Sequence, residues 1–395
     1  MFSNARVTSS ICGPSRASIM TGQYARRTGI HGFNKQLTPS QLANTYPVLM
    51  KDNGYRIGFV GKYGIGSDNL PQDEYDFWAG WPGWGQYQGH KDKNGNPVHL
   101  TRKLGNDSID FLETCKNQQP FCLSVSFKAP HCQDGDPRQF ITDPSYDDVY
   151  KNTVFTPAEK ANREYWNKLP DFFKKDNEAR KRWEIRFSSK ELYQRMVRKY
   201  HTLIYGVDVE VGRICKKLEQ IGVADNTIII FTSDNGFYLG EHGLAGKWYP
   251  HEESIRIPLI IYDPRPGNKY KGIKRKQMAL NIDLAPTMLD LAGITPPQQM
   301  QGKSLLPVIN NNVDLRKDFF YEHLLDHDSI PKTEGVIGER YKYIRWITQE
   351  PVHETLWDLK VNPEETINFA TRPEYQDVLM AMRKRYFDLT EKLNN

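Results

Sequence analysis

Three short apolar runs, each followed at once by charged or polar residues, constrain the fold of this chain most strongly. They span residues 55–60, 121–127 and 228–231. Short apolar runs bounded by turn residues are typical of strands that are fully buried in a parallel-type sheet. The amphipathic stretch 190–220 predicts a long helix that packs on such a sheet. We therefore predict an α/β protein in which the carboxyl ends of the strands carry the chemistry.

The stretches between these runs predict the remaining elements. Residues 41–53 and 100–113 each indicate a helix by their apolar spacing, and 374–393 indicates a third near the C-terminus. Residues 76–96 are rich in Trp, Gly and Tyr and lack periodicity, so we predict a loop that either contacts a ligand or packs over the core.

The length and charge of the chain limit its class. At 395 residues it is long enough for one large α/β domain and a smaller one. The formal net charge of +5 favours the approach of a polyanion but is too small to indicate nucleic-acid binding. No nucleic-acid motif and no run of transmembrane length is present. We expect no nucleic-acid partner and no membrane span.

The five cysteines do not follow a zinc-binding pattern. Neither a Cys-x-x-Cys pair nor a Cys/His zinc spacing occurs. If Cys12 is set aside, the other four cysteines allow at most two disulfides, and the sequence leaves their pairing open.

The stretch 12–22, CGPSRASIMTG, places a potential nucleophile beside a permanent cation. Pro14 fixes one backbone dihedral, and the residues after it can form a helix that Gly22 ends. Cys12 would then lie at or just before a helix N-terminus, where backbone N–H groups favour an anion, and Arg16 projects back toward it. A buried or disulfide-bonded cysteine is the structural alternative.

This stretch resembles the signature of the formylglycine-dependent (type I) sulfatases, which belong to the alkaline phosphatase-like superfamily. The matching pattern is Cys-x-Pro-Ser-Arg followed by Thr-Gly. The resemblance implies that Cys12 is oxidised after translation to formylglycine, whose hydrate is the nucleophile, and that Arg16 is catalytic. It also implies a large mixed, mostly parallel sheet flanked by helices, with a small C-terminal α+β subdomain.

Later motifs resemble the same family and add candidate catalytic residues. Lys62 aligns with an active-site lysine that holds a sulfate oxygen, and His131 aligns with a substrate-facing histidine that can act as general acid. Lys247 aligns with a second active-site lysine. The family's histidine two residues after the first lysine is Gly64 here, and we expect His242 to cover its role.

The third apolar run ends in a carboxylate and a carboxamide side by side, Asp234 and Asn235. Two adjacent oxygen ligands at a strand end suit a hard cation such as Ca²⁺, although an Asp-Asn-Gly turn without metal has the same local pattern. The match to the family's Thr-Ser-Asp-Asn-Gly segment implies one Ca²⁺ per chain, held by these residues and by the side chain made from Cys12.

The resemblance divides the chain into a catalytic domain, residues 1–307, and a C-terminal antiparallel sheet with one helix, residues 308–395. In relatives an earlier strand that ends in Asp-Asp supplies two more metal ligands, whereas the residues before Cys12 include no acidic residue. We expect a fragment of a longer protein whose upstream part carries that pair and a signal peptide. The protein would then be periplasmic or secreted.

These features predict a sulfuric ester hydrolase that removes sulfate from a sulfated carbohydrate. Arg16, Lys62 and Lys247, together with a metal, would neutralise the oxygens of a sulfate monoester. The resemblance also implies a maturation partner, either the formylglycine-generating enzyme or the anaerobic sulfatase-maturating enzyme. Two alternatives stay open, namely a phosphonate or phosphate ester hydrolase of the same superfamily and an inactive polyanion-binding relative. The sequence does not specify the sugar, the sulfated position or the oligomeric state.

Overall fold

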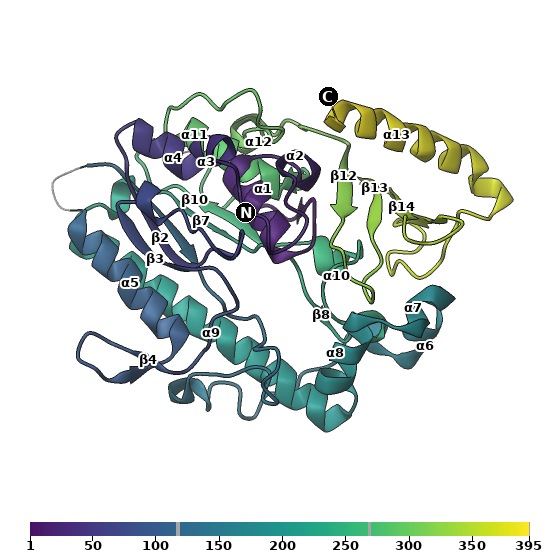
Figure 1. The fold of residues 1–395 in the computed structure, drawn as a ribbon, viewed down its shortest axis with the longest axis horizontal. Helices are drawn as coiled ribbons and strands as arrows, with labels where there is room; N and C mark the ends of the chain where they lie inside the picture. Colours follow the sequence, from purple (N-terminus) through teal and green to yellow (C-terminus); the bar gives the residue numbers. More distant parts are fainter. Residues whose placement is uncertain (116–118, 268–269, 395) are drawn as a thin grey trace.

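The computed structural model describes residues 1–115, 119–267 and 270–394 (Figure 1). Its strands, in chain order, are β1 (Ala5–Arg6), β2 (Arg56–Lys62), β3 (Phe77–Trp81), β4 (His90–Lys91), β5 (Pro97–Val98), β6 (Phe121–Ser126), β7 (Ile229–Thr232), β8 (Tyr238–Leu239), β9 (Ala245–Gly246), β10 (Leu259–Tyr262), β11 (Ala279–Leu280), β12 (Asp318–His323), β13 (Thr333–Gly338), β14 (Tyr341–Trp346) and β15 (His353–Asp358). Its α-helices are α1 (Cys12–Thr21), α2 (Ala25–Thr28), α3 (Pro39–Ala43), α4 (Tyr46–Asp52), α5 (Leu100–Thr114), α6 (Arg163–Asn167), α7 (Asp171–Lys175), α8 (Glu178–Phe187), α9 (Lys190–Gln220), α10 (Glu252–Ile255), α11 (Leu284–Leu291), α12 (Leu306–Asn311) and α13 (Gln376–Asn394).

The α/β class is confirmed by parallel strands with helices on both faces. β2 pairs in parallel with β3 on one side and with β6 on the other. Helices α5 and α9 run along one face of this sheet, and α4 with α11 covers the other (Figure 1). α9 spans the residues that the amphipathic pattern predicts, because its apolar stripe has a sheet and α5 to pack on.

Two predicted elements differ from the structure. The single helix expected over 41–53 is two helices, α3 and α4, because Pro47 lies in the first turn of α4 and lacks the N–H that a continuous helix needs there. The loop expected over 76–96 contains β3, whose Trp78 stacks on Phe59 of β2 with ring centroids 5.0 Å apart. Aromatic packing across the two strands offsets the weak periodicity of this segment.

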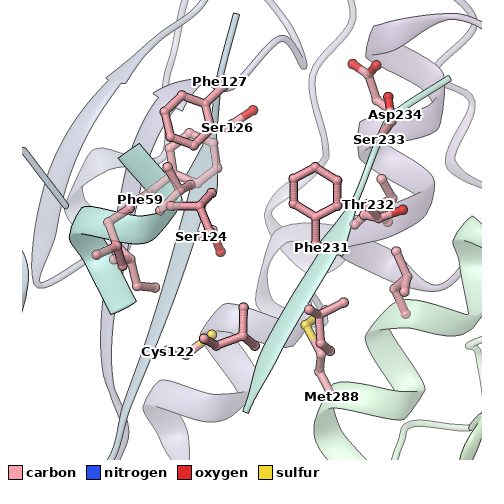
Figure 2. Close-up of a pocket in the computed structure, with 18 of the residues that line it drawn as sticks. Phe59, Cys122, Ser124, Ser126, Phe127, Phe231, Thr232, Ser233, Asp234 and Met288 are labelled. Carbon is pink, nitrogen blue, oxygen red and sulfur yellow. The ribbon is translucent and has the colours of Figure 1, made fainter. Parts of the chain in front are cut away.

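The large sheet is interrupted between β6 and β7. Among the described residues, β6 pairs only with β2, and β7 pairs only with antiparallel β10. A cavity of about 1240 Å³ separates the facing edges of β6 and β7 and is lined by both strands (Figure 2). The prediction that both strands are fully buried is therefore wrong. Both are partly exposed, and the Phe231 side chain, which points into this space, is 40% exposed.

The C-terminal residues form an antiparallel meander of β12 to β15, with α13 across one face (Figure 1). Its core is continuous with that of the N-terminal part, because Val7 and Tyr249 share one apolar cluster with Phe319 and Trp346. The boundary predicted at residue 307 falls inside α12. In the described ranges, none of the helices has both the length and the apolar character that crossing a bilayer requires.

Candidate active site

Helix α1 begins at Cys12 and buries its thiol. Ile11, in extended conformation, precedes the helix. Gly22 ends it in the left-handed region (φ 66°), and its N–H donates to the carbonyl of Ser18 at 2.9 Å. The Cys12 residue is 1% exposed. The predicted placement of Cys12 at a helix N-terminus and of Gly22 at the helix end is confirmed.

Two buried lysines converge on the sulfur of Cys12. The Nζ atom of Lys247 lies 3.1 Å from Cys12 Sγ, and that of Lys62 lies 3.6 Å away. Lys62 is the last residue of β2, and Lys247 follows β9 directly. Both side chains are buried, so their charges are poorly screened by water. The fold thus brings together three candidate residues that are far apart in the sequence.

Arg16 ties α1 to the carboxyl ends of three strands. Its Nε donates to Asp234 Oδ2 at 2.8 Å, just beyond β7. Its Nη1 donates to the carbonyl of Lys62 at 2.6 Å and also to the hydroxyl of Ser126, the last residue of β6. Parallel strands that end at one edge explain why residues from separate motifs meet here.

Gly64 gives the pocket part of its shape. It has a φ of +71°, and a Cβ at this position would lie 3.2 Å from both Arg16 Cδ and Lys62 Cε. Any side chain here would have a strained backbone and would crowd the two cations. A histidine at position 64, which the family pattern has, would therefore not fit beside Arg16 and Lys62 as they lie here.

His131 enters the pocket from the loop after β6. Its Nδ1 lies 2.6 Å from the carbonyl oxygen of Cys132, a contact that assigns the proton to Nδ1 and leaves Nε2 as an acceptor. Burial, with the charges of Lys247 and Lys62, lowers the pKa of His131 well below its usual value. In the free protein the ring is therefore neutral. A bound anion would raise the pKa of His131 and so favour the protonated ring that a general acid needs.

The charges around Cys12 favour its thiolate. Burial alone would raise the pKa of this thiol, but Lys247, Lys62 and Arg16 outweigh burial and the Asp234 carboxylate, and they lower it to about 7. Burial instead raises the pKa of Cys122 to about 12 and that of Cys132 to about 11. All five cysteines are free thiols, so the difference comes from their surroundings. Cys12 is the reactive one in chemical terms.

Asp234 and Asn235 present oxygen atoms where β7 ends. Within the described residues, Asn235 Oδ1 is buried and has no hydrogen-bond partner, while its Nδ2 donates to the carbonyl of Gly236 at 2.7 Å. An orphaned amide oxygen next to a carboxylate suits a hard cation. Because Ca²⁺ takes about six to eight oxygen ligands, these two residues fit only part of a calcium site.

The C-terminal sheet positions Lys247 through its neighbour. Trp248 has a φ of 91°, an unfavourable region for a residue with a side chain. Its N–H donates to the carbonyl of Ser10 at 3.2 Å, and its carbonyl accepts from the hydroxyl of Tyr321 on β12 at 2.8 Å. These bonds hold the strained backbone beside the lysine. No sequence pattern singles out Tyr321, because its role depends on how the two parts pack.

His242 does not join this pocket. Its ring stacks on His251 with centroids 4.4 Å apart, and its Nε2 lies 3.7 Å from Glu253 Oε2. The residue is fully buried, and among the described residues no hydrogen bond or ion pair joins it to Cys12. The structure therefore gives no support to the catalytic role predicted for His242, because packing encloses the ring elsewhere.

Sequence reasoning also missed residues that share the cavity with the predicted ones. Ser126, Lys128 and Trp84 line the same cavity as Lys62 and His131. The position of Lys128 at the end of the second apolar run is a signal that could have found it. Trp84 lies in a segment with many aromatic residues, and nothing in the sequence distinguishes it from the others.

The sequence has clear relatives of known activity. Residues 1–294 match the family described as "Sulfatase", and residues 240–392 match "N-sulphoglucosamine sulphohydrolase, C-terminal". The chain is 29% identical to the N-acetylglucosamine-6-O-sulfatase of Bacteroides thetaiotaomicron, over 95% of this chain and 76% of that protein. It is 30% identical to the N-acetylglucosamine-6-sulfatase of Homo sapiens, over 82% of this chain and 61% of that protein.

Solved structures show the same fold. A protein in complex with its substrate, D-glucosamine-2-N,6-O-disulfate, has a TM-score of 0.86 and 25% identity, covering 100% of this chain and 90% of its own. The phosphonate monoester hydrolase of Agrobacterium radiobacter has a TM-score of 0.79 over 99% of this chain and 88% of its own. At 20% identity the second similarity shows the shared fold alone.

Proposed function

The chain belongs to the sulfatase family, whose members are sulfuric ester hydrolases, and we propose that it hydrolyses the sulfate ester of a sulfated glucosamine with a nucleophile made from Cys12. The observation that carries this proposal is the convergence of two lysine ammonium groups on Cys12 Sγ, at 3.1 and 3.6 Å. A buried pocket with more cations than anions is suited to a substrate that brings its own negative charge.

The cations act on the sulfate group. Lys62 and Lys247 lie where an ester bound at residue 12 would place its sulfonyl oxygens, and both are buried, so their attraction for an anion is stronger than in water. Arg16 is held by Asp234 and supports the pocket wall next to them. Their charges are in place before substrate binds, which favours the transition state because little reorganisation is needed.

The nucleophile in this proposal is formylglycine, the aldehyde made by oxidation of Cys12. When hydrated it supplies two hydroxyl groups, one for attack on sulfur and one that permits later release of sulfate. The Cys-x-Pro-Ser-Arg pattern, which the other four cysteines lack, supports the choice of Cys12 for oxidation. A formylglycine-generating or anaerobic sulfatase-maturating enzyme would be the partner that carries it out.

His131 is the candidate acid for the departing alcohol. Its Nδ1 is engaged by the Cys132 carbonyl, so Nε2 is the ring atom that can take up and donate a proton. In the free protein the burial and lysine charges keep it neutral, and the negative charge of a bound ester would raise its pKa toward the range in which it can donate a proton. The proton would then pass from Nε2 to the oxygen of the leaving sugar.

The metal site in this proposal is shared with a further strand. Both β6 and β7 present unpaired edges to the cavity between them, and both end near Asp234 (Figure 2). A strand inserted between them in the direction of β6 would finish beside Asp234 and Asn235. The Asp-Asp pair that the family resemblance implies would arrive on such a strand. A calcium ion there would add positive charge and lower the pKa of a bound hydroxyl.

A synthetic peptide tests this shared site. An eight-residue peptide of β-branched residues that ends in Asp-Asp should raise the melting temperature of the protein, and calcium should raise it further. A matched peptide that ends in Asn-Asn should fill the cavity but give a much smaller calcium effect, because it lacks the carboxylates. If neither peptide changes the melting temperature, the cavity between β6 and β7 is not a strand site.

The substrate proposal rests on the names of the relatives. The two sulfatases named above act on N-acetylglucosamine 6-sulfate groups by name, and the solved structure holds a 6-O-sulfated glucosamine. We therefore infer that a 6-O-sulfated glucosamine, free or at a chain end, is the substrate class of this pocket.

The decisive experiment combines mass spectrometry with a release assay. The peptide that contains Cys12 should lose about 18 Da after co-expression with a maturating enzyme. The matured protein should release sulfate from glucosamine 6-sulfate but little phosphate from the matched phosphate ester. Cys12→Ala should abolish release, whereas Cys215→Ala, which changes a half-buried residue of α9, should retain it. Faster phosphate or phosphonate release would favour the ester-hydrolase alternative, and binding without turnover would favour an inactive relative.

A further inference from the structure

Trp84 stands at the mouth of the pocket with a large part of its ring system open to solvent. The residue is 47% exposed, although it is large and apolar. It lines the same cavity as Arg16, Lys62 and His131. An exposed indole that borders a charged pocket is a feature that core packing alone does not explain.

The backbone of Trp84 is anchored from inside the protein. The buried side chain of Lys128 donates from Nζ to the carbonyl of Trp84 at 2.9 Å and to that of Gly85 at 3.0 Å. The ring also contacts Phe33, with centroids 5.4 Å apart. These contacts fix the position of the indole although it lies in a loop. A rigid aromatic surface loses little conformational entropy when it binds a ligand.

The indole is close to the reacting atoms. Lys62 Nζ lies 4.7 Å from the centroid of the Trp84 ring and 3.6 Å from Cys12 Sγ. The imidazole of His131 lies on another side, with ring centroids 5.5 Å apart and planes inclined at 49°. A single ammonium group therefore bridges the nucleophile position and the aromatic surface, and the candidate acid borders the aromatic surface.

We propose that Trp84 is the platform on which the pyranose ring of the substrate stacks, a specificity role that rests on the proposed function. One face of a pyranose presents C–H groups, which pack on an indole, while its hydroxyl and sulfate groups point sideways. A sugar on Trp84 would hold its ester within reach of Lys62 and its leaving oxygen toward His131. Stacking on Trp84 would favour substrates that have a pyranose ring, whatever group carries the negative charge.

The test separates recognition of the sugar from recognition of the sulfate. Sulfate release is measured from glucosamine 6-sulfate and from a short alkyl sulfate that has no ring. Trp84→Ala should raise KM for the sugar sulfate by about tenfold with kcat little changed, and should leave KM for the alkyl sulfate unaltered. Trp84→Phe should keep most of the affinity for the sugar, because it retains an aromatic face.

Fluorescence gives a second readout that does not need turnover. Glucosamine 6-sulfate should quench the tryptophan emission of the parent protein, and Trp84→Phe should remove this quenching. Trp183→Phe is the matched control, since Trp183 also packs under a cation, Arg180 at 3.9 Å, but does not line the cavity. It should leave the quenching intact.

Each contrary result has its own meaning. An equal loss for both substrates in Trp84→Ala would overturn the proposal, because Trp84 would then only support Lys62. An unchanged KM for the sugar sulfate, or unchanged quenching in Trp84→Phe, would also overturn it. If the parent protein releases no sulfate while quenching by the sugar persists and depends on Trp84, the proposed function fails and the stacking site stands.

Discussion

Two clusters of buried charged side chains in this protein differ in their balance. Around Cys12, the described residues place three cations, Arg16, Lys62 and Lys247, against the single carboxylate of Asp234. This cluster, the Cys12 pocket, has two more positive charges than negative ones, and one excess positive charge is left even when the thiol is ionised.

The second cluster, the Lys342 cluster, joins the C-terminal sheet to the N-terminal part. It contains three buried cations and three buried carboxylates among the described residues: Arg6, Lys160, Lys342, Glu252, Glu253 and Glu365. Lys160 also lies 3.5 Å from the partly exposed carboxylate of Glu364. Lys342 Nζ lies 2.6 Å from carboxylate oxygens of both Glu252 and Glu365 and donates to the Pro250 carbonyl at 3.1 Å. Every charge in this cluster has a partner inside the protein.

The difference separates a stabilising cluster from a binding one. A buried charge is tolerated when it is paired, and the Lys342 cluster is paired by its own residues. The Cys12 pocket lacks two negative charges, which a ligand and residue 12 can supply. The same comparison places His242 with the second cluster, since it lies 3.7 Å from Glu253.

The largest effect is expected from breaking the balanced cluster. Lys342→Met would leave Glu365 and Glu252 buried without their ammonium partner, so the free energy of unfolding should fall by about 3–5 kcal/mol. Urea denaturation followed by circular dichroism measures it. The comparison is wrong if the fall is no larger than that caused by replacing an exposed lysine such as Lys384.

In the Cys12 pocket, removing a lysine should lower activity and not stability. Lys247→Met should lower kcat/KM for a sulfate ester by about 10²–10³-fold, because one stabilising charge is lost at the transition state. In the matured protein, in which residue 12 carries no thiolate, its free energy of unfolding should stay equal or rise, since one of three neighbouring like charges is removed. Steady-state kinetics and the same urea titration check the pair of effects. A variant that loses stability as well as activity would show that Lys247 is structural.

The acidity of Cys12 predicts a pH dependence in the unmodified protein. Its pKa falls from 9.0 to about 7 on folding, so between these values the unfolded state binds more protons and stability must rise with pH. The gain should be at most about 2–3 kcal/mol, complete above pH 9 and absent below pH 7. Urea titrations at several pH values should show this slope in the parent and not in Cys12→Ser. An equal slope in both would contradict a lowered pKa.

The smallest effect is expected from a simple anion. Inorganic sulfate should raise the stability of the protein by about 1–3 kcal/mol at concentrations well above its dissociation constant, because it binds only the folded pocket. Sulfate also stabilises proteins by exclusion from their surface, so the double variant Lys62→Met, Lys247→Met gives the baseline. Thermal unfolding in sulfate and in chloride of equal ionic strength measures the difference. An identical rise in melting temperature in the parent and the double variant would show that sulfate does not bind at Lys62 and Lys247.

Much of the Cys12 pocket could be predicted because its residues follow strands. Lys62 is the last residue of a predicted strand, His131 and Asp234 lie a few residues beyond two others, and parallel strands end at one edge of a sheet. His242 also lies in a motif of the right kind, but a motif does not tell where its side chain packs. The roles of Trp84 and Tyr321 could not be predicted from the sequence, because their positions depend on contacts with distant segments.

The amino-acid sequence alone determined the α/β class, the helix that begins at Cys12 and the set of cations available to an anion. Local spacing and short-range sterics decide these features. Only the tertiary structure decided that β6 and β7 face each other across an open cavity, and that one group of buried charges is balanced while the other is not. Both depend on which distant side chains share a low-dielectric interior, and no local pattern records that.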